Sequence, residues 1–255
     1  MTIATWNING IRARLDRLVQ WLEKARPDVV CLQEIKCVED QFPMDRITGA
    51  GYHAAVYGQK AFNGVAILAR SEPLDVVRGL GDDVGDLQAR LIAATVDGVR
   101  VLSAYVPNGG DMGSDKYAYK LAWLRRLLDT LDMAGVPAGD LALCGDFNII
   151  PEDRDAREPS QWEGTVLYNP EVRALLGEIV GLGLSDVFRR FHTESELYSW
   201  WDYRRLAFPR NDGLRIDLVL CTPSLEKRCS DAFIERDERK GEKPSDHVPV
   251  VAVLD

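Results

Sequence analysis

Five short apolar segments of this chain end in acidic, amide or imidazole side chains. They span residues 3–7, 29–34, 141–148, 214–217 and 245–250. Apolar runs of four to eight residues are typical of buried strands. A polar side chain at the end of such a strand must be hydrogen-bonded or bound to a metal, because leaving it without a partner away from water costs several kcal/mol. The segments therefore predict strands whose polar ends form one site at the edge of a sheet.

Length and composition predict one domain, residues 1–255. The chain has no linker-like tract rich in Ser, Gly or Pro, and its hydrophobic content of 46% is sufficient for a sizeable core. No stretch approaches the roughly 18 apolar residues that a membrane helix requires. The N-terminus leads directly into a strand-like segment, without the basic and apolar parts of a signal peptide. We therefore expect a soluble, cytoplasmic protein that makes no membrane contact.

The cysteines indicate a reduced protein without a zinc site. The five residues cannot all pair with one another, and none forms a C-x-x-C motif. Cys31, Cys144 and Cys221 lie inside apolar runs. We expect them to be small buried side chains, the usual role of cysteine in such a context.

The net charge of −9 argues, at first reading, against a nucleic-acid partner, because phosphate binding needs a basic surface. Net charge does not say where the charges lie, however, and a cluster of active-site carboxylates makes the total more negative. Basic residues gather within residues 12–17, 116–120 and 204–215. Each group is either a solvated face or part of a surface that binds a polyanion.

The order of the elements predicts an α/β fold. A strand at 2–7, an amphipathic helix from Leu15 to just before Pro27 and a strand at 28–33 form a β-α-β unit with parallel strands. Further strands are expected near 52–57, 64–69, 73–79, 90–96, 99–106, 140–145, 197–201, 214–221, 229–234 and 247–254, and helices near 117–134 and 170–181. This mixture of crossovers and hairpins predicts a four-layer α/β sandwich, in which two mixed β-sheets pack face to face with helices outside.

Five motifs in series carry a family resemblance. They are residues 5–10 (TWNING), 32–36 (LQEIK), 105–109 (YVPNG), 145–149 (GDFNI) and 245–247 (SDH). In this order the chain resembles the exonuclease III family of apurinic/apyrimidinic (AP) endonucleases, within the endonuclease/exonuclease/phosphatase superfamily. Each motif alone is weak, but the series is specific. The resemblance implies a metal-dependent enzyme of DNA base-excision repair.

A metal site is expected around Glu34. The resemblance implies Mg²⁺, with Mn²⁺ as an alternative, and Mg²⁺ prefers carboxylate, amide and water oxygens. Glu34 is the best ligand candidate, with Asn7 positioning metal or phosphate and Asp246 assisting. Outside this series of motifs, an acid such as Glu34 after a strand would be interpreted as a surface residue.

The resemblance also implies the catalytic residues. Asp146 and Asn148 alternate at a strand end, so we expect them on one face, holding a water that Asp146 activates. His247 is expected to pair with Asp217, which favours the imidazolium that stabilises phosphate charge. Tyr105 matches a tyrosine that contacts the scissile phosphate; the alternative is a half-buried strand tyrosine.

Residues 199–204 and 211–217 match the stretch that forms the wall of a pocket for an extruded abasic sugar. Substrate-binding roles are accordingly expected for Trp200, Leu214, Ile216, Asn108, Lys116 and Arg204. One of the two adjacent tryptophans at 200 and 201 is expected to be a core residue instead. Some relatives carry tryptophan where Leu214 stands, so the pocket here has its own shape. The loop 108–115 lacks the arginine that some relatives insert into DNA, and Met112 is the candidate to replace it.

The predicted function is hydrolysis of the phosphodiester 5′ to an abasic site, leaving a 3′-hydroxyl and a 5′-deoxyribose phosphate. We also expect 3′-to-5′ exonuclease and 3′-end-cleaning activity on double-stranded DNA with abasic or 3′-blocked sites. The protein is expected to act as a monomer, without an obligate protein partner. Two alternatives are a phosphodiesterase or phosphatase acting on a small-molecule or lipid phosphate, and a non-enzymatic DNA-binding relative. The aromatic segment at 200–204 argues against the first, and the filled catalytic positions argue against the second.

Overall fold

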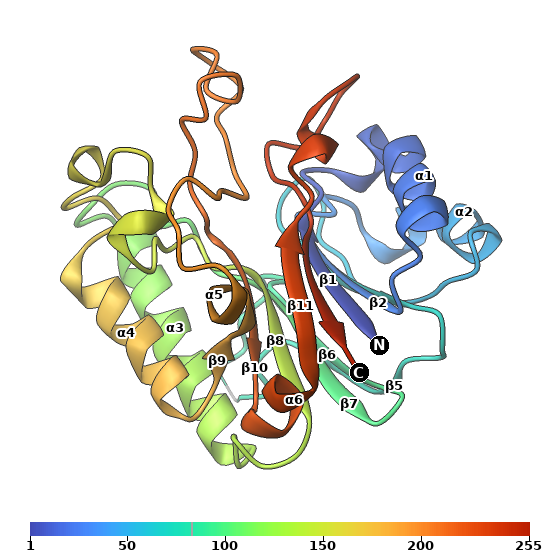
Figure 1. Cartoon of the computed structure of the whole chain (residues 1–255). Helices are drawn as coiled ribbons and strands as arrows, with labels where there is room; N and C mark the ends of the chain where they lie inside the picture. The colour runs from blue at the N-terminus through green and yellow to red at the C-terminus, as the bar shows by residue number, and fades with distance from the viewer. Residues whose placement is uncertain (83) are drawn as a thin grey trace.

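Two mixed sheets pack against each other in the computed structural model, which describes residues 1–82 and 84–255. Within these residues each sheet has six strands. Helices α1 (Leu15–Ala25) and α2 (Met44–Gly49) lie on the outside of one sheet, and α3 (Asp115–Met133) and α4 (Pro170–Gly181) on the outside of the other (Figure 1). The predicted four-layer α/β sandwich is therefore confirmed.

The first sheet has the order β11-β12-β1-β2-β4-β3, and the second has the order β5-β6-β7-β8-β10-β9. The strands of the first are β1 (Thr2–Asn7), β2 (Val29–Gln33), β3 (His53–Tyr57), β4 (Val65–Ala69), β11 (Cys229–Ile234) and β12 (Val250–Leu254). Those of the second are β5 (Leu74–Arg78), β6 (Leu91–Val96), β7 (Val99–Tyr105), β8 (Leu141–Asp146), β9 (Ser185–Asp186) and β10 (Asp217–Cys221). Two short helices, α5 (Val187–Phe191) and α6 (Pro223–Arg228), flank β10 in the sequence.

Each sheet contains a parallel pair at its centre, joined by a helix on its outer face. In the first sheet α1 connects β1 to β2, and in the second α3 connects β7 to β8. Parallel strands need such a crossover, and it leaves their carboxyl ends at the same edge. Tyr105 therefore lies directly opposite Asp146, and antiparallel β10 places Asp217 opposite Asp146 from the other side. The pairing itself brings the polar strand ends together.

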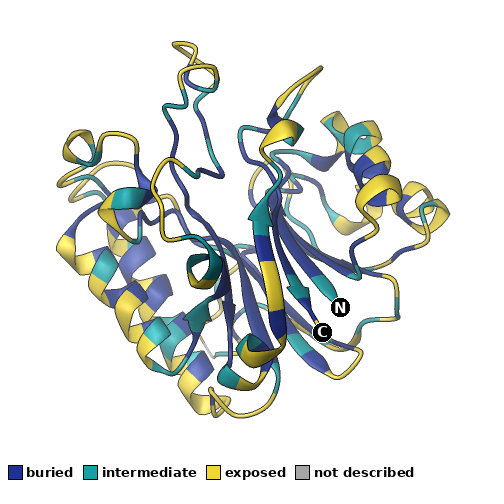
Figure 2. Cartoon of the chain, viewed as in Figure 1, coloured by how far each residue is buried: buried dark blue, intermediate teal, exposed yellow. Residues whose placement is uncertain are grey.

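Buried apolar residues form clusters between the layers. The strands are mostly buried, whereas the outer faces of the helices are exposed (Figure 2). The core between the sheets includes Cys31 and Cys144, and all five cysteines are free and buried in the described part of the chain. The predicted burial of Cys31, Cys144 and Cys221 is confirmed. Gly145 is required here, because a Cβ at this position would lie 1.9 Å from the carbonyl oxygen of Ala104. Among the helices that the structure describes, none is both long and apolar enough to span a membrane.

The predicted strand at 197–201 is wrong. Trp200 makes only isolated bridges, to Leu214 and to His247, and the segment joins neither sheet. Strands β10 and β12, one in each sheet, also begin later than predicted, at Asp217 and Val250. Pro249 has no N–H group for a ladder hydrogen bond, which explains why β12 begins just after it. The residues just before these two strands include Leu214, Ile216 and His247, which border the candidate site.

Candidate active site

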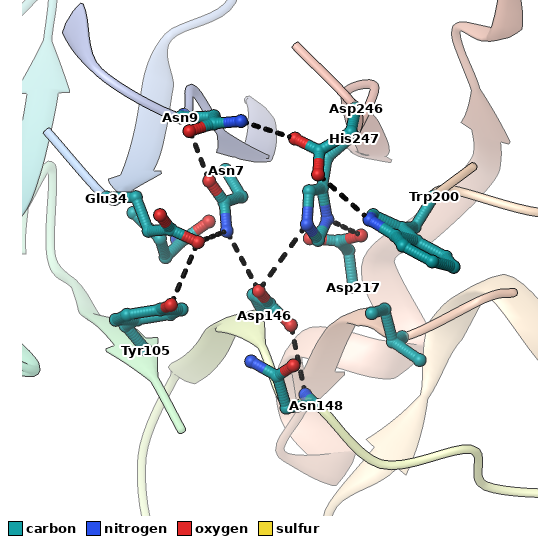
Figure 3. Close-up of polar contacts among 12 residues, drawn as sticks. Asn7, Asn9, Glu34, Tyr105, Asp146, Asn148, Trp200, Asp217, Asp246 and His247 are labelled. Atoms are coloured by element: carbon teal, nitrogen blue, oxygen red, sulfur yellow. Dashed lines mark hydrogen bonds and ion pairs between the residues drawn. The ribbon is translucent and has the colours of Figure 1, made fainter. Parts of the chain in front are cut away.

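A pocket of about 200 Å³ opens at the edge where the parallel strands end. The residues that line it are Glu34, Tyr105, Asn108, Asp146, Asn148, Leu167, Trp200, Leu214, Ile216, Asp246 and His247. Most of the residues predicted for the site therefore meet in one cavity. Asp217 lies directly behind His247, and Asn7 contacts two of the lining carboxylates (Figure 3).

His247 lies between two buried carboxylates. Its Nδ1 is 2.9 Å from Asp217 Oδ2, and its Nε2 is 3.7 Å from Asp146 Oδ2. Burial acts to lower the pKa of His247, but the charges of Asp217 and Asp146 outweigh it and raise the pKa to about 10. Ser199 Oγ donates to Asp217 Oδ2 at 2.6 Å, which fixes the outer carboxylate. The expected pair of Asp217 and His247 is present, and its imidazole is held as the cation.

Asp146 is buried beside other acids. Burial raises its pKa to about 7, the charges of Asp217 and Glu34 act in the same direction, and His247 opposes them. Asn7 Nδ2 donates to Asp146 Oδ2 and to Glu34 Oε1, both at 2.9 Å. The amide nitrogen of Asn7 thus faces the acids and holds the two carboxylates close to each other.

Glu34 follows β2 in a left-handed backbone conformation, with φ +51°. Its Oε1 accepts a hydrogen bond from the Tyr105 hydroxyl at 2.8 Å, and its Oε2 lies 2.7 Å from Lys36 Nζ. Burial acts to raise the pKa of Glu34, but Lys36 and Asn7 together lower it. Burial and the charge of Glu34 raise the pKa of Tyr105 well above its usual value. Glu34 is therefore ionised and Tyr105 is a neutral donor.

Sequence reasoning missed Lys36 and Asn9. Lys36 Nζ bonds both Glu34 Oε2 and, at 2.6 Å, Asn9 Oδ1, while Asn9 Nδ2 donates to Asp246 Oδ1 at 2.8 Å. These contacts form a polar chain between Glu34 and Asp246, which both line the pocket. Both residues lie inside motifs that were already recognised, so the signal was available in their side-chain chemistry.

We call the polar side of the pocket its floor; it consists of Glu34, Tyr105, Asp146 and His247, with Asp217 behind His247. This floor is rich in oxygen atoms and fits a divalent cation. Ligand atoms of Asp146, Asp217 and His247 all lie within 4.8 Å of one another, and Glu34 faces Asp146 across the Asn7 amide. Carboxylate oxygens are the donors that hard cations prefer. Burial and the neighbouring acids raise the pKa of Asp146, and a cation beside it would stabilise its ionised form. Glu34 and Asp146 line the pocket, whereas Asp217 lies behind His247, so the first two are the carboxylates that could hold the cation.

Asn148 reaches the site in a different way from the one predicted. Strand β8 ends at Asp146 and Asn148 has a φ of +48°, so strand alternation does not orient its side chain. Its backbone N–H donates to Asp146 Oδ1 at 3.0 Å. Its side chain bonds Asn108 Nδ2 at 3.0 Å and the carbonyl of Val106 at 3.1 Å. Asn148 therefore orients Asp146 through its backbone and ties down the 106–108 loop through its side chain.

One wall of the pocket is apolar. Trp200, Leu214 and Ile216 form it together with Leu167, a residue in an irregular segment that no sequence motif marked. Trp200 Nε1 donates to Asp246 Oδ2 at 3.1 Å, and Trp162 packs against the Trp200 ring edge-on. Burial acts to raise the pKa of Asp246, but His247, Trp200 and Asn9 lower it. Asp246 is thus an anionic anchor for the wall.

The neighbouring Trp201 is fully buried and packs against Phe208. The expectation that one of the two tryptophans belongs to the core is confirmed for Trp201. Trp200 is the tryptophan that borders the pocket.

Two predicted substrate contacts lie outside the pocket. Lys116 is exposed and lines an adjoining groove of about 570 Å³, together with Arg90 and Tyr119. Arg204 is exposed and pairs with Asp202 at 2.8 Å.

Two further basic residues were counted with surface clusters, and that interpretation was wrong. Lys120 and Arg215 are fully buried. Lys120 donates hydrogen bonds to three backbone carbonyls, and Arg215 pairs with Asp155 and Asp186. The buried partners satisfy both charges, and partners from distant segments leave no local signal in the sequence.

Comparisons with known proteins give matches over nearly the whole chain. A family model described as "Endonuclease/Exonuclease/phosphatase family" matches residues 4–247. Exodeoxyribonuclease III of Haemophilus influenzae is 36% identical over 264 aligned residues, covering 99% of each chain. An AP endonuclease structure from Archaeoglobus fulgidus superposes with a TM-score of 0.97 at 40% identity, covering 100% of this chain and 99% of the other. A Neisseria 3′ phosphatase bound to a product DNA hairpin gives the same TM-score, identity and coverage.

Proposed function

The chain belongs to the endonuclease/exonuclease/phosphatase family, as a DNA-repair nuclease of the exodeoxyribonuclease III and AP endonuclease type, and we propose that it incises double-stranded DNA 5′ to abasic sites. Cleavage of the P–O3′ bond would leave a 3′-hydroxyl and a 5′-deoxyribose phosphate. The observation that best supports this proposal is a charged floor that meets an apolar wall inside one small pocket.

The size and chemistry of the pocket support this substrate. Its volume of about 200 Å³ is below the roughly 300 Å³ at which pockets for drug-sized ligands begin. A deoxyribose without a base fits such a space better than a complete nucleotide, and the wall of Trp200, Leu214 and Ile216 offers no partner to a base edge. Extruding an abasic sugar is also inexpensive, because no base pair has to be broken.

The floor supplies groups for phosphodiester hydrolysis. Asp146, oriented by the Asn148 N–H, accepts the proton of the attacking water. The imidazolium of His247 faces Asp146 and stabilises the charge that develops on the phosphoryl oxygens. The neutral hydroxyl of Tyr105 donates to Glu34 at the same edge and would turn to a phosphate oxygen when the substrate binds.

The proposal also includes a divalent cation in the pocket. Glu34 would hold it, beside Asp146, with Asn7 and Asp246 as the further expected contributors. Mg²⁺, or Mn²⁺ in its place, suits this oxygen set and would neutralise negative charge on the phosphate when bound. Asn7 keeps Glu34 and Asp146 together, so it would contribute even without being a ligand.

The test is one incision experiment with three substrates. The purified protein is incubated, with Mg²⁺ or with EDTA, with a duplex that contains one abasic analogue, an undamaged duplex and a duplex with a 3′-phosphate end. We expect a single cut 5′ to the analogue, in Mg²⁺ only. Loss of the abasic strand only by shortening from its 3′ end would contradict the proposal. Inactivity on all three would favour a small-molecule phosphodiesterase instead.

A second activity, removal of 3′-blocking groups, is favoured by the Neisseria 3′ phosphatase, which matches as well as the AP endonuclease does. The same floor would serve, since a 3′-phosphate presents the same phosphoryl group. Release of phosphate from the third substrate would support this activity, and its absence would restrict the enzyme to incision.

A further inference from the structure

Lys120 lies inside the protein, on the buried face of α3. Its neighbours on this face are apolar, among them Leu121, Leu124 and Leu127, and Lys120 itself is 0% exposed. Its Nζ donates to the carbonyl oxygens of Asn108 at 3.1 Å, Asn148 at 2.6 Å and Val166 at 2.8 Å. A lysine ammonium has three donors, so three carbonyls use all of them.

The three carbonyls belong to segments far apart in the sequence that meet at the pocket. Asn108 and Asn148 line it directly, and Val166 immediately precedes Leu167 of the apolar wall. Lys120 therefore connects the loop after β7, the turn after β8 and the irregular segment before α4. It lines no part of the pocket itself, so it has no direct contact with a substrate there.

The packing around the ammonium is close. Gly109 has a φ of +100°, and a Cβ there would lie 3.0 Å from Lys120 Cδ and 3.1 Å from Val166 Cβ. Glycine is therefore required for the loop to approach the lysine stem. Among the residues that the structure describes, Lys120 forms no ion pair with an acid.

A buried ammonium without a carboxylate is costly, and burial lowers the pKa of Lys120 to about 7. A methionine would fill similar space without this cost. A costly polar group at a site that packing alone could fill points to a role in geometry. That role is visible in the segments it joins, each of which holds a residue of the pocket.

We propose that Lys120 is a positioning residue, which holds the 106–109, 147–149 and 165–167 segments in register so that Asn108, Asn148 and Leu167 form one pocket. The consequence for activity rests on the proposed function, whereas the consequence for local order does not. Loss of the ammonium would loosen all three segments at once. The first two would keep only the hydrogen bonds of the Asn148 side chain, and the third would keep the bond from the Ile150 N–H to the Leu167 carbonyl.

The test compares Lys120→Met with Leu124→Ala. Leu124 is fully buried one turn later on the same helix, so its truncation weakens the packing of α3 without removing these hydrogen bonds. Both variants are assayed at a temperature at which circular dichroism shows them folded. We expect kcat on the abasic duplex to fall by about 100-fold in Lys120→Met, the cost of a misplacement of about 1 Å, and much less in Leu124→Ala.

Hydrogen exchange measured by mass spectrometry provides a readout that is independent of activity. Peptides covering the three segments should exchange faster together in Lys120→Met, and remain protected in Leu124→Ala. If the Met variant does not fold, Lys120→Gln, which keeps two N–H donors, should show the same pattern more weakly.

Equal losses of kcat and of protection in the two variants would reduce Lys120 to a contributor to stability and overturn the proposal. An inactive wild-type protein would instead contradict the proposed function, and the exchange data would still decide the role of Lys120.

Discussion

The floor and the wall of the pocket are built in different ways. Three residues of the floor, Tyr105, Asp146 and Asp217, lie on adjacent strands, directly opposite one another in the ladder of β7, β8 and β10, and Glu34 directly follows β2. The wall residues Leu167, Trp200 and Leu214 lie in irregular segments that join neither sheet. The continuous ladder of a sheet thus positions the floor, whereas the wall depends on isolated backbone hydrogen bonds, such as those between Trp200 and Leu214, and on side chains.

A buried ion cluster supports the wall from behind. Arg215 lies between the wall residues Leu214 and Ile216 and is fully buried. Its Nε is 2.6 Å from Asp155 Oδ1, and one terminal nitrogen is 2.7 Å from Asp186 Oδ2. The backbone N–H of Arg215 also donates to the Asp155 carbonyl at 2.8 Å. The wall is therefore fixed from its far side, independently of the reacting groups.

The floor carries the groups for the reaction and the wall selects the substrate, so the difference in how they are built separates reaction from selectivity. A floor built from strand ends changes only if the sheets change, but a wall built from loops can vary without disturbing them. The same floor can therefore serve relatives with different substrates. Four predictions test this separation, beginning with the floor.

Asp146→Asn should have the largest effect. The amide keeps the shape of the side chain but cannot accept the proton of the attacking water, so we expect kcat to fall by about 10²–10⁴-fold with little change in KM. The free energy of unfolding should stay the same or rise, because a buried carboxylate with a raised pKa is replaced by a neutral group. Steady-state incision kinetics and urea unfolding measure the two effects. Near wild-type turnover would rule out Asp146 as the base.

Arg215→Met should act on stability first. Removing the guanidinium leaves Asp186 without this partner and Asp155 with Arg189 alone, and breaking such a buried pair costs up to about 3–5 kcal/mol. The matched control is Arg204→Met, whose surface pair with Asp202 should leave the free energy of unfolding almost unchanged. Guanidinium unfolding of both variants measures the difference. Similar values for the two would show that the cluster does not hold the wall.

Trp200→Ala should raise KM for the abasic duplex by about tenfold, at the lower end of what one apolar contact contributes to discrimination, with kcat nearly unchanged. The wall loses its aromatic face while the floor remains intact. Trp201→Ala, one residue later, should instead destabilise the fold by about 3–5 kcal/mol, because Trp201 is a core residue. A fall in kcat without a change in KM for Trp200→Ala would place the tryptophan with the floor.

Acid should reduce the stability that the Asp155 ion pairs provide, with a smaller effect than that of the substitutions above. Burial acts to raise the pKa of Asp155, but Arg215 and Arg189 outweigh it and lower the pKa. The unfolded chain therefore takes up this proton first, as pH falls through about 4. The stabilisation is fully present above that pH and is lost as pH falls through the lower folded pKa. Urea unfolding between pH 5 and 3 should show a steeper loss for wild type than for Asp155→Asn. Parallel curves would contradict the lowered pKa.

Much of the floor could be predicted because its signal is local. An apolar run followed by a polar residue identifies a strand end, and parallel strands bring their carboxyl ends to one edge. The pair of Asp217 and His247, 30 residues apart, was predicted from the motifs and is present at 2.9 Å. Strand geometry does not extend to Asn148 or to residues 197–201, because the backbone leaves the sheet there.

The sequence by itself determined the fold class, the strand ends and the chemistry gathered at them. Only the tertiary structure decided which basic residues are buried, that Leu167 completes the wall, and that Lys120 joins three segments of the pocket. The physical reason is the range of the interactions. A strand and its polar end are encoded within about six residues, whereas a buried cation is explained only by partners that the fold brings from distant segments.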